Sequence, residues 1–196
     1  MKASVFVGAS LDGFIARPDG GLDWLPQNAE DHGYNEFIAT VDALVIGRNT
    51  YETVLSFGGW YYGDKPVFVL STRPLAPAPA EARVQRLSGE PTDIVAQVAA
   101  QGFSHIYVDG GITVQRFLRA GLIQRLIVTH VPVLIGEGIP LFGPLPGDVR
   151  LKHVATRTFL SGLVQSEYRL GSEDSPGSPE SRGEIAGLKI ESLGPA

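Results

Sequence analysis

The stretch Ala43-Leu44-Val45-Ile46 runs directly into Gly47-Arg48-Asn49-Thr50, and this junction decides the fold. The four apolar residues are typical of a strand that is buried on both faces. The polar turn that follows leads into a short helix over residues 51–55. Backbone amides at a helix N-terminus, together with an arginine and a hydroxyl, suit a pyrophosphate group. The junction therefore predicts a strand–turn–helix unit whose turn is a candidate anion site.

A second buried strand, over residues 67–69, also ends in a polar turn. The residues of this turn are Leu70, Ser71, Thr72 and Arg73. Two hydroxyls beside an arginine suit a ribose 2′-phosphate, because the guanidinium fork offers paired donors. Taken alone, such a stretch is more often a solvated loop.

A third strand, over residues 106–108, ends at a glycine pair. The residues that follow it are Asp109, Gly110, Gly111, Ile112 and Thr113. Adjacent glycines let a backbone approach a ligand closely, and Thr113 is predicted to cap the next helix. Ligands of open α/β sheets bind beyond the C-terminal ends of the strands, so the three turns share one edge if their strands are parallel.

The rest of the chain alternates strands with helices and closes on a hairpin. We predict strands over residues 3–9, 84–87 and 125–135, helices over 28–40, 92–101 and 113–120, and a hairpin formed by 153–158 and 163–170. This order predicts an α/β fold, with a mixed sheet and helices on both faces.

Composition excludes several classes of function. The 196 residues are 43% hydrophobic and 19% charged, which is typical of one globular domain. The net charge of −5 argues against nucleic-acid binding. Without cysteine there is no disulfide, thiol nucleophile or cysteine-bound zinc, and the four histidines lack metal-ligand spacing. No apolar run suits a membrane span or a signal peptide, so we expect a cytoplasmic protein without membrane contact.

The composition changes at Gly171. Residues 171–196 are rich in Gly, Ser, Pro and Glu and carry two basic and five acidic residues. We expect a domain over residues 1–170 followed by a mostly mobile tail without a catalytic role. The alternative is that residues 185–193 dock on a neighbouring surface.

The ordered set of motifs resembles the dihydrofolate reductase fold. Within it, the chain is most similar to the reductase domain of bifunctional riboflavin-biosynthesis enzymes and its stand-alone relatives. The resemblance covers residues 1 to about 170. It is carried by residues 9–16 (ASLDGFIA), 23–24 (DW), 46–52 (IGRNTYE), 69–74 (VLSTRP), 108–111 (VDGG), 129–132 (THVP) and 136–142 (GEGIPLF). It implies a three-layer fold with a mostly parallel central sheet and a C-terminal antiparallel hairpin.

The resemblance also implies roles for the three turns. Gly47, Arg48 and Thr50 resemble the cofactor-phosphate loop of the family. Residues 71–73 resemble its 2′-phosphate site, which implies NADPH rather than NADH. Residues 110–111 resemble a glycine pair that contacts the diphosphate and can be joined by a cis peptide bond. Two further implied contacts, to the nicotinamide, come from the backbone of Ala9 and Ile15, and residues 17–24 resemble a loop that closes over the site.

The substrate-binding acid is less clear. Dihydrofolate reductases place one acid on the first helix after a tryptophan-proline stretch. Here Glu30 and Asp31 are the first acidic residues after Trp24. Either of them, or neither, is the equivalent of that substrate-binding acid. Asp109 stands where dihydrofolate reductases have an apolar residue and the riboflavin branch often has an acid. This departure favours a small heterocyclic or carbonyl substrate other than folate, protonated by one of these acids or by water.

Structural explanations compete at each of these positions. Asp31 caps a helix or protonates substrate, and Asp109 braces the glycine turn or acts in catalysis. Trp24 stacks near the substrate or fixes its loop. Residues 60–62 (Trp-Tyr-Tyr) line the pocket or pack in an interface.

Three hypotheses follow for the whole protein. The first is an NADPH-dependent reductase of a small molecule. The second is a non-catalytic NADP(H)-binding sensor or interaction module, and the third is a domain whose motifs are only turns. The riboflavin branch often forms dimers, so we expect a homodimer, with residues 125–135 as a candidate interface strand.

Overall fold

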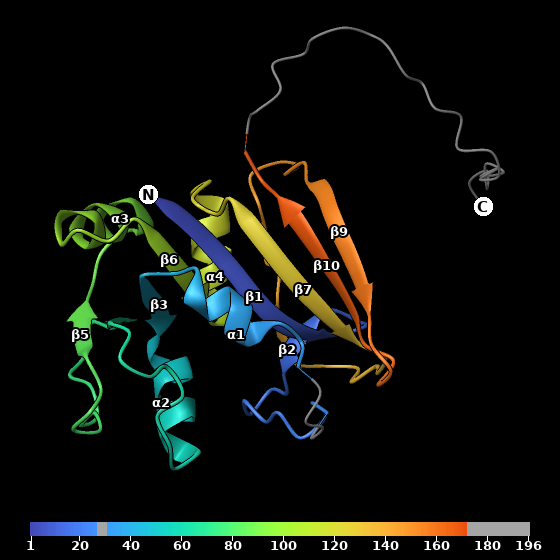
Figure 1. The fold of residues 1–196 in the computed structure, drawn as a ribbon, viewed down its shortest axis with the longest axis horizontal. Helices are drawn as coiled ribbons and strands as arrows, with labels where there is room; N and C mark the ends of the chain where they lie inside the picture. The colour runs from blue at the N-terminus through green and yellow to red at the C-terminus, as the bar shows by residue number, and fades with distance from the viewer. Residues whose placement is uncertain (27–30, 172–196) are drawn as a thin grey trace, which may run out of the picture.

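The computed structural model describes residues 1–26 and 31–171, so Glu30 and all but the first residue of the tail predicted over 171–196 lie outside the described residues. Eight strands form one sheet in the order β5-β4-β3-β6-β1-β7-β10-β9 (Figure 1). They are β1 (Lys2–Ser10), β3 (Ala43–Gly47), β4 (Val67–Leu70), β5 (Val84–Leu87), β6 (His105–Asp109), β7 (Arg125–Val131), β9 (Lys152–Thr158) and β10 (Val164–Arg169). A separate small sheet pairs β2 (Phe14–Ala16) with β8 (Ile139–Pro140).

The large sheet is mixed, and most of it is parallel. Strand β1 lies parallel to β6 and β7, β3 lies parallel to β4 and β6, and β4 lies parallel to β5. Strand β10 runs antiparallel to both β7 and β9, which closes the chain with the expected hairpin. The predicted mixed sheet is confirmed. Since β1, β3, β4 and β6 are parallel, the turns that follow β3, β4 and β6 lie at one edge.

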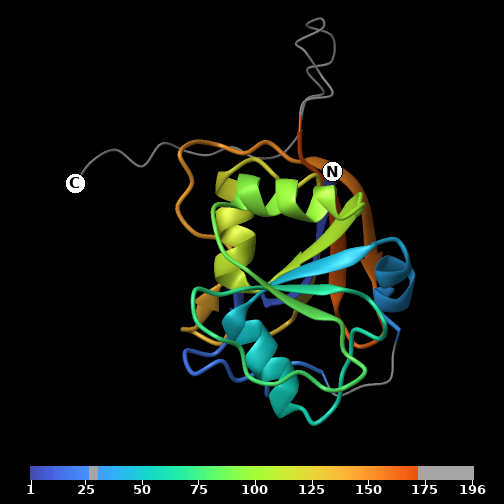
Figure 2. The ribbon, with the colours of Figure 1, turned by 90° about the vertical axis from the view of Figure 1, so that its left-hand side faces the viewer.

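The described residues form four helices. They are α1 (Tyr34–Ala39), α2 (Arg48–Ser56), α3 (Pro91–Ala100) and α4 (Gly111–Arg119). Helices α3 and α4 lie on one face and α1 lies on the other (Figure 2). Successive side chains of β3 point to opposite faces of the sheet and so contribute to the cores on both sides. Val45 packs in the core under α3 and α4, whereas Leu44 and Ile46 pack with Phe37 of α1. Burial of each such side chain contributes about 1.5–3 kcal/mol.

The first helix is shorter than expected. A helix was predicted over residues 28–40, but α1 begins only at Tyr34, after Gly33 in the left-handed region (φ 82°). The Asp31 carboxylate accepts a hydrogen bond from the Gly33 amide at 2.8 Å, which forms a turn ahead of the helix. The predicted capping of this helix by Asp31 is therefore wrong, because a glycine turn separates the two.

Two other local predictions need correction. Thr113 does not cap α4, because the helix already begins at Gly111 with Gly110 as its uncapped N-terminal residue. The run 125–135 is not one long strand, because β7 ends at Val131; it lies between β1 and β10 with both edges paired, so it has no edge free to pair with a second chain.

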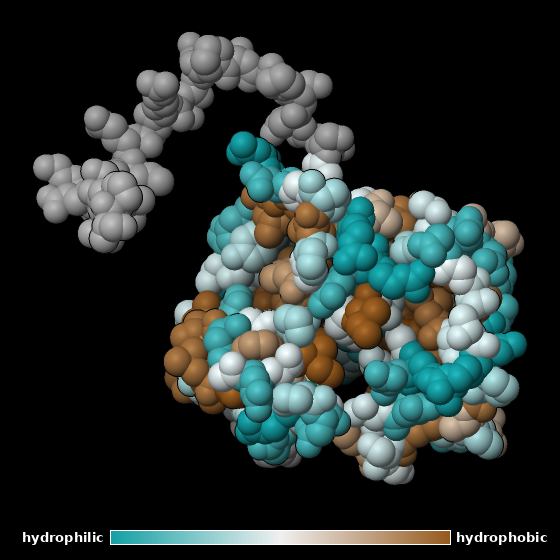
Figure 3. Space-filling view, turned by 180° about the vertical axis from the view of Figure 1, so that it is seen from behind, coloured by the Kyte–Doolittle hydropathy of each residue, from teal (hydrophilic) through white to brown (hydrophobic). Residues whose placement is uncertain are grey.

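The surface is mixed in polarity. Seen from behind, hydrophobic residues are interrupted by hydrophilic ones (Figure 3). Within residues 1–26 and 31–171, no helix combines the length and the apolar character needed to cross a membrane.

One serine–histidine pair lies at the opposite edge of the sheet. Ser4 Oγ is 2.7 Å from His105 Nε2, and His105 Nδ1 is 2.6 Å from the Thr40 carbonyl oxygen. Ser4 is fully buried, so no substrate reaches its hydroxyl. The pair links β1, β6 and the end of α1, and its role is structural.

Candidate functional site

A cleft of about 860 Å³ opens at the C-terminal ends of β1, β3 and β6. Helix α2 and the loop over residues 17–25 contribute its walls. Many of the residues predicted from sequence line it. They are Ile15, Gly47, Arg48, Thr50, Leu70, Asp109, Gly110, Gly111, Ile112 and Thr113. The structure therefore brings the turns after β3 and β6, with the last residue of β4, to one concave surface.

The turns after β3 and β6 interlock through two glycine–threonine contacts. A Cβ atom on Gly47 would lie 2.9 Å from Thr113 Oγ1, and one on Gly110 would overlap Thr50 Oγ1. Gly110 also has φ 92°, a conformation that L side chains rarely adopt. Each turn thus holds the glycine against which the threonine of the other turn packs, so the two turns are positioned as one unit.

This unit places two helix N-termini at the cleft. Helices α2 and α4 each have nine residues. The N-cap residue of each is a glycine, Gly47 and Gly110, so neither helix has a side-chain cap. The first amides of an uncapped helix lack partners within the helix and carry partial positive charge, so they attract anions. The Gly110–Gly111 peptide bond is trans rather than cis, as are all peptide bonds in the described residues.

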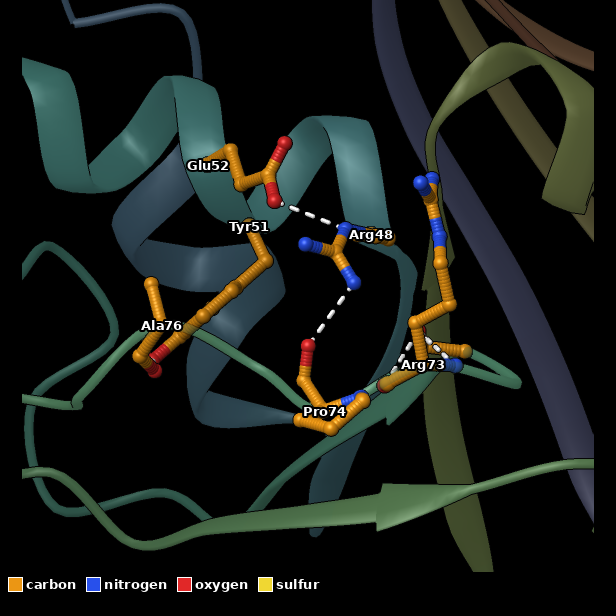
Figure 4. A network of polar contacts seen from close by, with 7 residues as sticks. Arg48, Tyr51, Glu52, Arg73, Pro74 and Ala76 are labelled. Atoms are coloured by element: carbon orange, nitrogen blue, oxygen red, sulfur yellow. Dashed lines mark hydrogen bonds and ion pairs between the residues drawn. The ribbon is translucent and has the colours of Figure 1, made fainter.

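A polar network extends from α2 to the loop after β4 (Figure 4). Arg48 Nε donates to Glu52 Oε1 at 2.7 Å, and Arg48 Nη1 donates to the Pro74 carbonyl oxygen at 2.8 Å. Tyr51, buried in α2, donates to the Ala76 carbonyl oxygen at 2.9 Å. These bonds hold the 71–76 loop beside the first turn of α2.

The predicted 2′-phosphate residues lie at the rim of this region. Ser71 Oγ accepts from the Arg73 amide at 3.1 Å and donates to the Arg73 carbonyl oxygen at 2.8 Å, so this hydroxyl shapes the loop. Thr72 and Arg73 are exposed. The Arg73 guanidinium has no hydrogen-bond or ion-pair partner among the described residues. Residues 71–73 do not line the cleft itself, but they follow Leu70, which does.

The 17–25 loop forms the opposite wall. Arg17 makes a bidentate ion pair with Asp23, at 2.6 and 2.8 Å, that holds the two ends of the loop together. The neighbouring Asp12 carboxylate accepts from the amides of Ile135 and Gly136. Trp24 does not line the cleft, and its indole Nε1 is buried without a hydrogen-bond partner in the described part of the chain. The Arg17–Asp23 pair therefore fixes the shape of this wall of the cleft.

The two residues expected at the nicotinamide differ in position. Ile15 lines the cleft and its Cδ1 approaches Gly111, at 2.9 Å from where a Cβ atom would stand. Ala9 is fully buried in the core, and the cleft is lined instead by its neighbours Val7 and Gly8.

Asp109 lies deep at the floor of the cleft and remains partly open to it. Burial raises the pKa of its carboxyl to about 6, although the Gly110 amide, which donates to it at 2.8 Å, and the nearby Tyr107 hydroxyl lower it. The carboxylate in turn raises the pKa of Tyr34, to about 12, where burial is the larger cause. It adds to the effect of burial on the pKa of Tyr62 and Tyr107. Asp109 is therefore a protonatable acid among three phenols.

Asp31 is placed differently. It is exposed, does not line the cleft and is engaged with the Gly33 amide. Of the two candidate acids that the structure describes, Asp109 lines the cleft and Asp31 does not; Glu30 falls outside the described residues.

Sequence analysis missed Tyr34 and Tyr107. Tyr107 sits inside a strand of apolar residues, where it resembles an ordinary core aromatic, and Tyr34 resembles one member of a helical apolar stripe. Of the 60–62 aromatics, Tyr62 lines the cleft, Trp60 packs edge-on against Tyr62, and Tyr61 is exposed. No local signal distinguishes these tyrosines, because their role depends on Asp109.

Comparisons with known proteins agree with this geometry. Residues 2–165 match the model of the RibD C-terminal domain. A crystal structure from Shewanella sp. PV-4, of a protein assigned to riboflavin biosynthesis, is 40% identical, with a TM-score of 0.81 over 88% of this chain and 100% of that one. A deaminase/5-amino-6-(5-phosphoribosylamino)uracil reductase from Thermotoga maritima has a TM-score of 0.65 at 16% identity, over 87% of this chain and 56% of that one. Dihydrofolate reductase from Enterococcus faecalis, complexed with NADP(H), has a TM-score of 0.64 at 18% identity, over 87% and 97%.

Proposed function

The chain belongs to the RibD C-terminal domain family, and on that premise we propose that it is an NADPH-dependent reductase of a small heterocyclic or carbonyl compound. One observation carries the proposal. Two uncapped helix N-termini, interlocked through Gly47–Thr113 and Thr50–Gly110, face the same cleft as a carboxyl with a raised pKa. This arrangement combines a site for a diphosphate with a proton donor.

The residues present fit NADPH. Amides 48–50 and 111–113 would hold the diphosphate, and the absence of a side chain at Gly47 and Gly110 leaves room for close approach. The free guanidinium of Arg73 is available for a 2′-phosphate beside the 48–52 turn. The strip formed by Val7, Gly8 and Ile15 would face the nicotinamide.

The chemistry divides between cofactor and protein. When bound, the nicotinamide supplies a hydride to the carbon of a substrate C=N or C=O bond, and the adjacent nitrogen or oxygen then needs one proton. Asp109 donates that proton, directly or through one water, because its raised pKa keeps a useful fraction protonated near neutral pH. The 17–25 loop, held by Arg17 and Asp23, excludes bulk water.

The substrate range follows from the same cleft. The Thermotoga relative is named as the reductase of a phosphoribosylamino-uracil. We propose that a planar ring of that general kind binds beside the aromatic residues that line the cleft and the strip of Val7, Gly8 and Ile15, so the proposed substrate is a nitrogen heterocycle or a small carbonyl compound.

A second function has its own support. The features that bind a cofactor come from backbone and interlocked turns, whereas the proposed chemistry depends on a single carboxyl. We therefore retain a non-catalytic NADP(H)-binding sensor as the alternative. Saturable binding without turnover across a panel of heterocycles and carbonyl compounds would favour it.

The direct test is a fluorescence titration of the folded protein with NADPH and, separately, NADH, using Trp24 and Trp60 as reporters. We expect saturable binding that prefers NADPH, and its loss in the double variant Arg48→Ala/Arg73→Ala. The matched control is Arg83→Ala/Arg86→Ala, which removes two exposed arginines outside the cleft and should bind normally. If the folded protein binds neither nucleotide, the reductase and the sensor are both excluded.

A further inference from the structure

We propose that the Tyr62 hydroxyl binds the substrate, and that it selects compounds with a second hydrogen-bond acceptor beside the bond that is reduced. This inference deepens the proposed function and rests on it. It is carried by a buried phenol that lines the cleft and has no hydrogen-bond partner within the described chain.

Tyr62 differs from the other two tyrosines whose pKa responds to Asp109. The Tyr107 hydroxyl is already engaged, because it donates to the Phe6 carbonyl oxygen at 2.7 Å. Tyr34 does not line the cleft. Tyr62 lines the cleft and is only 7% exposed, yet its hydroxyl has no hydrogen-bond partner among the described residues. Of these three described tyrosines, Tyr62 is therefore the one whose hydroxyl is available to a ligand in the cleft.

The Tyr62 oxygen is not enclosed in the core. It does not belong to the side-chain atoms of the described chain that are fully shielded from solvent and also lack a partner. The oxygen therefore keeps contact with solvent although its ring is buried, and the cleft is the opening that Tyr62 lines. Water can satisfy the hydroxyl in the free protein, but a ligand that fills the cleft displaces this water and must replace its hydrogen bond.

The ring that carries this hydroxyl is held rigidly. Trp60 packs edge-on against Tyr62, with ring centroids 5.3 Å apart and an angle of 87° between the rings. Trp60 is fixed in turn by its indole Nε1, which donates to the Gly63 carbonyl oxygen at 3.1 Å, and by an edge-on contact with Tyr51 of α2. A side chain that is already ordered loses little entropy when a ligand binds, so the hydroxyl is preorganised for recognition.

The chemical role of Tyr62 differs from that of Asp109. Burial and the Asp109 carboxylate raise the pKa of Tyr62, so the phenol keeps its proton at neutral pH. The hydroxyl can therefore donate a hydrogen bond but does not supply a proton to the product. The influence of Asp109 on this pKa also shows that the two groups lie near each other. We infer that Asp109 binds the atom that becomes protonated, and that Tyr62 binds a neighbouring acceptor such as a carbonyl oxygen.

This arrangement narrows the range of substrates. A ligand with two adjacent acceptors satisfies both groups, whereas a simple ketone or aldehyde satisfies one of them. The other group would then be left without a partner in the filled cleft, which disfavours binding. The favoured substrate is therefore a planar ring with two adjacent acceptors, rather than a compound with a single carbonyl.

The test uses two planar bicyclic compounds that differ by one carbonyl. Isatin has two carbonyl oxygens side by side on one edge, and oxindole lacks one of them. Calorimetric titrations of the NADP⁺-saturated protein compare the two affinities. We expect isatin to bind about 10-fold more tightly, the effect of roughly one additional hydrogen bond. Equal affinities overturn the proposal, and so does the absence of isatin binding.

Tyr62→Phe removes the hydroxyl and keeps the ring. We expect the advantage of isatin over oxindole to disappear in this variant, while thermal stability does not fall, because no hydrogen bond of the described chain is lost. Tyr61→Phe is the matched control. Tyr61 is 60% exposed and does not line the cleft, so its variant should keep the full advantage.

Two results separate this inference from the proposed function. If the advantage of isatin persists in Tyr62→Phe, the hydroxyl does not bind the substrate, and only this inference is overturned. If the folded parent protein fails to bind NADP⁺ or NADPH, the proposed function is overturned and this inference with it.

Discussion

The two ends of the cleft are built from different parts of the polypeptide. At the proposed cofactor end, the groups offered for binding are backbone amides of α2 and α4, held in place by glycine–threonine contacts between two turns. At the proposed substrate end, they are side chains, where Asp109 lines the cleft with Tyr62 and Tyr107 and raises the pKa of both phenols. The cofactor end thus depends on chain geometry, and the substrate end depends on the environment of one titratable group.

This difference separates the effects of mutation at the two ends. A change in backbone geometry at Gly110 should abolish binding of the cofactor even when Asp109 is intact. A change of charge at Asp109 should leave the backbone site intact and remove the chemistry. The predictions below use this separation.

The largest effect is expected from Asp109→Asn. The amide cannot supply the proton, while its Oδ1 can still accept the hydrogen bond from the Gly110 amide. We expect kcat to fall about 1,000-fold, within the usual range for loss of a general acid, and NADPH affinity to be unchanged. Steady-state kinetics and a nucleotide titration on the same preparation measure the two quantities.

The pH profile identifies the acid. A donor must be protonated to act, so kcat of the parent protein should decline as the pH rises through about 6. The decline should vanish in Asp109→Asn. Asp31→Asn is the matched control and should retain both rate and profile, since Asp31 lies outside the cleft. If Asp31→Asn loses the rate and the pH dependence while Asp109→Asn keeps them, Asp31 is the proton donor.

Gly110→Ala tests the cofactor end. The new methyl group would overlap Thr50 Oγ1, and the residue would be held at φ 92°. The turn must shift to relieve both, so we expect NADPH affinity to fall about 100-fold, with a stability loss of about 2 kcal/mol or more. Fluorescence titration and thermal unfolding measure these two effects.

Gly102→Ala provides a close control for that variant. Gly102 has φ 91° but no atom within 4 Å of the added methyl group, and it precedes β6 at the far edge of the sheet. It should lose about 1 kcal/mol of stability with full NADPH affinity. Adding Thr50→Ala to Gly110→Ala should recover part of the lost stability. If it recovers none, the overlap with Thr50 is not the cause.

Asp109→Asn should also stabilise the folded protein at alkaline pH. The folded-state pKa is raised from 3.8 to about 6, so the carboxylate destabilises the fold above pH 6 and not below pH 3.8. Two pKa units correspond to about 3 kcal/mol, and exposure to the cleft reduces this to about 2 kcal/mol. Urea unfolding at pH 8 and at pH 4 should show the gain only at pH 8.

Asp42→Asn should behave in the opposite way. The Asp42 carboxylate accepts hydrogen bonds from the Ser104 amide and hydroxyl and from the His105 amide, which lower its pKa. Its ionised form supports the fold above its unfolded pKa, so the variant should be less stable at pH 8. A gain in stability from both substitutions would show only that the protein tolerates loss of negative charge.

The sequence predicted that the turns after β3 and β6 meet at one edge of the sheet, because the signals for these turns are local. Gly47 and Gly110 stand directly between a buried strand and a helix, and their order along the chain indicates one shared edge. The same local reasoning failed where a fold-level contact decides the outcome. It extended α1 back to residue 28, and it extended the strand that begins at Arg125 to residue 135, although β7 ends at Val131.

The substrate end could not be predicted in the same way. Tyr34, Tyr62 and Asp109 come from a helix, a loop and a strand end, and no spacing relates them. Asp31 and Asp109 were equivalent candidates as acidic residues in the sequence. Burial and the cleft distinguish them, because these determine which carboxyl is protonated near neutral pH.

The smallest effect concerns the choice between the two nucleotides. Arg48 is already bonded to Glu52 and Pro74, whereas the Arg73 guanidinium has no partner in the described chain. Arg73→Ala should therefore weaken NADPH binding about 10-fold through the lost phosphate contact and leave NADH binding unchanged. Arg86→Ala, at an exposed position on β5, should change neither affinity. If both nucleotides weaken equally in Arg73→Ala, the residue supports the loop rather than the 2′-phosphate. The preference for NADPH would then depend on Arg48. A Glu52→Gln variant weakens the ion pair between Glu52 and Arg48, so Arg48 would be released more easily when a nucleotide binds.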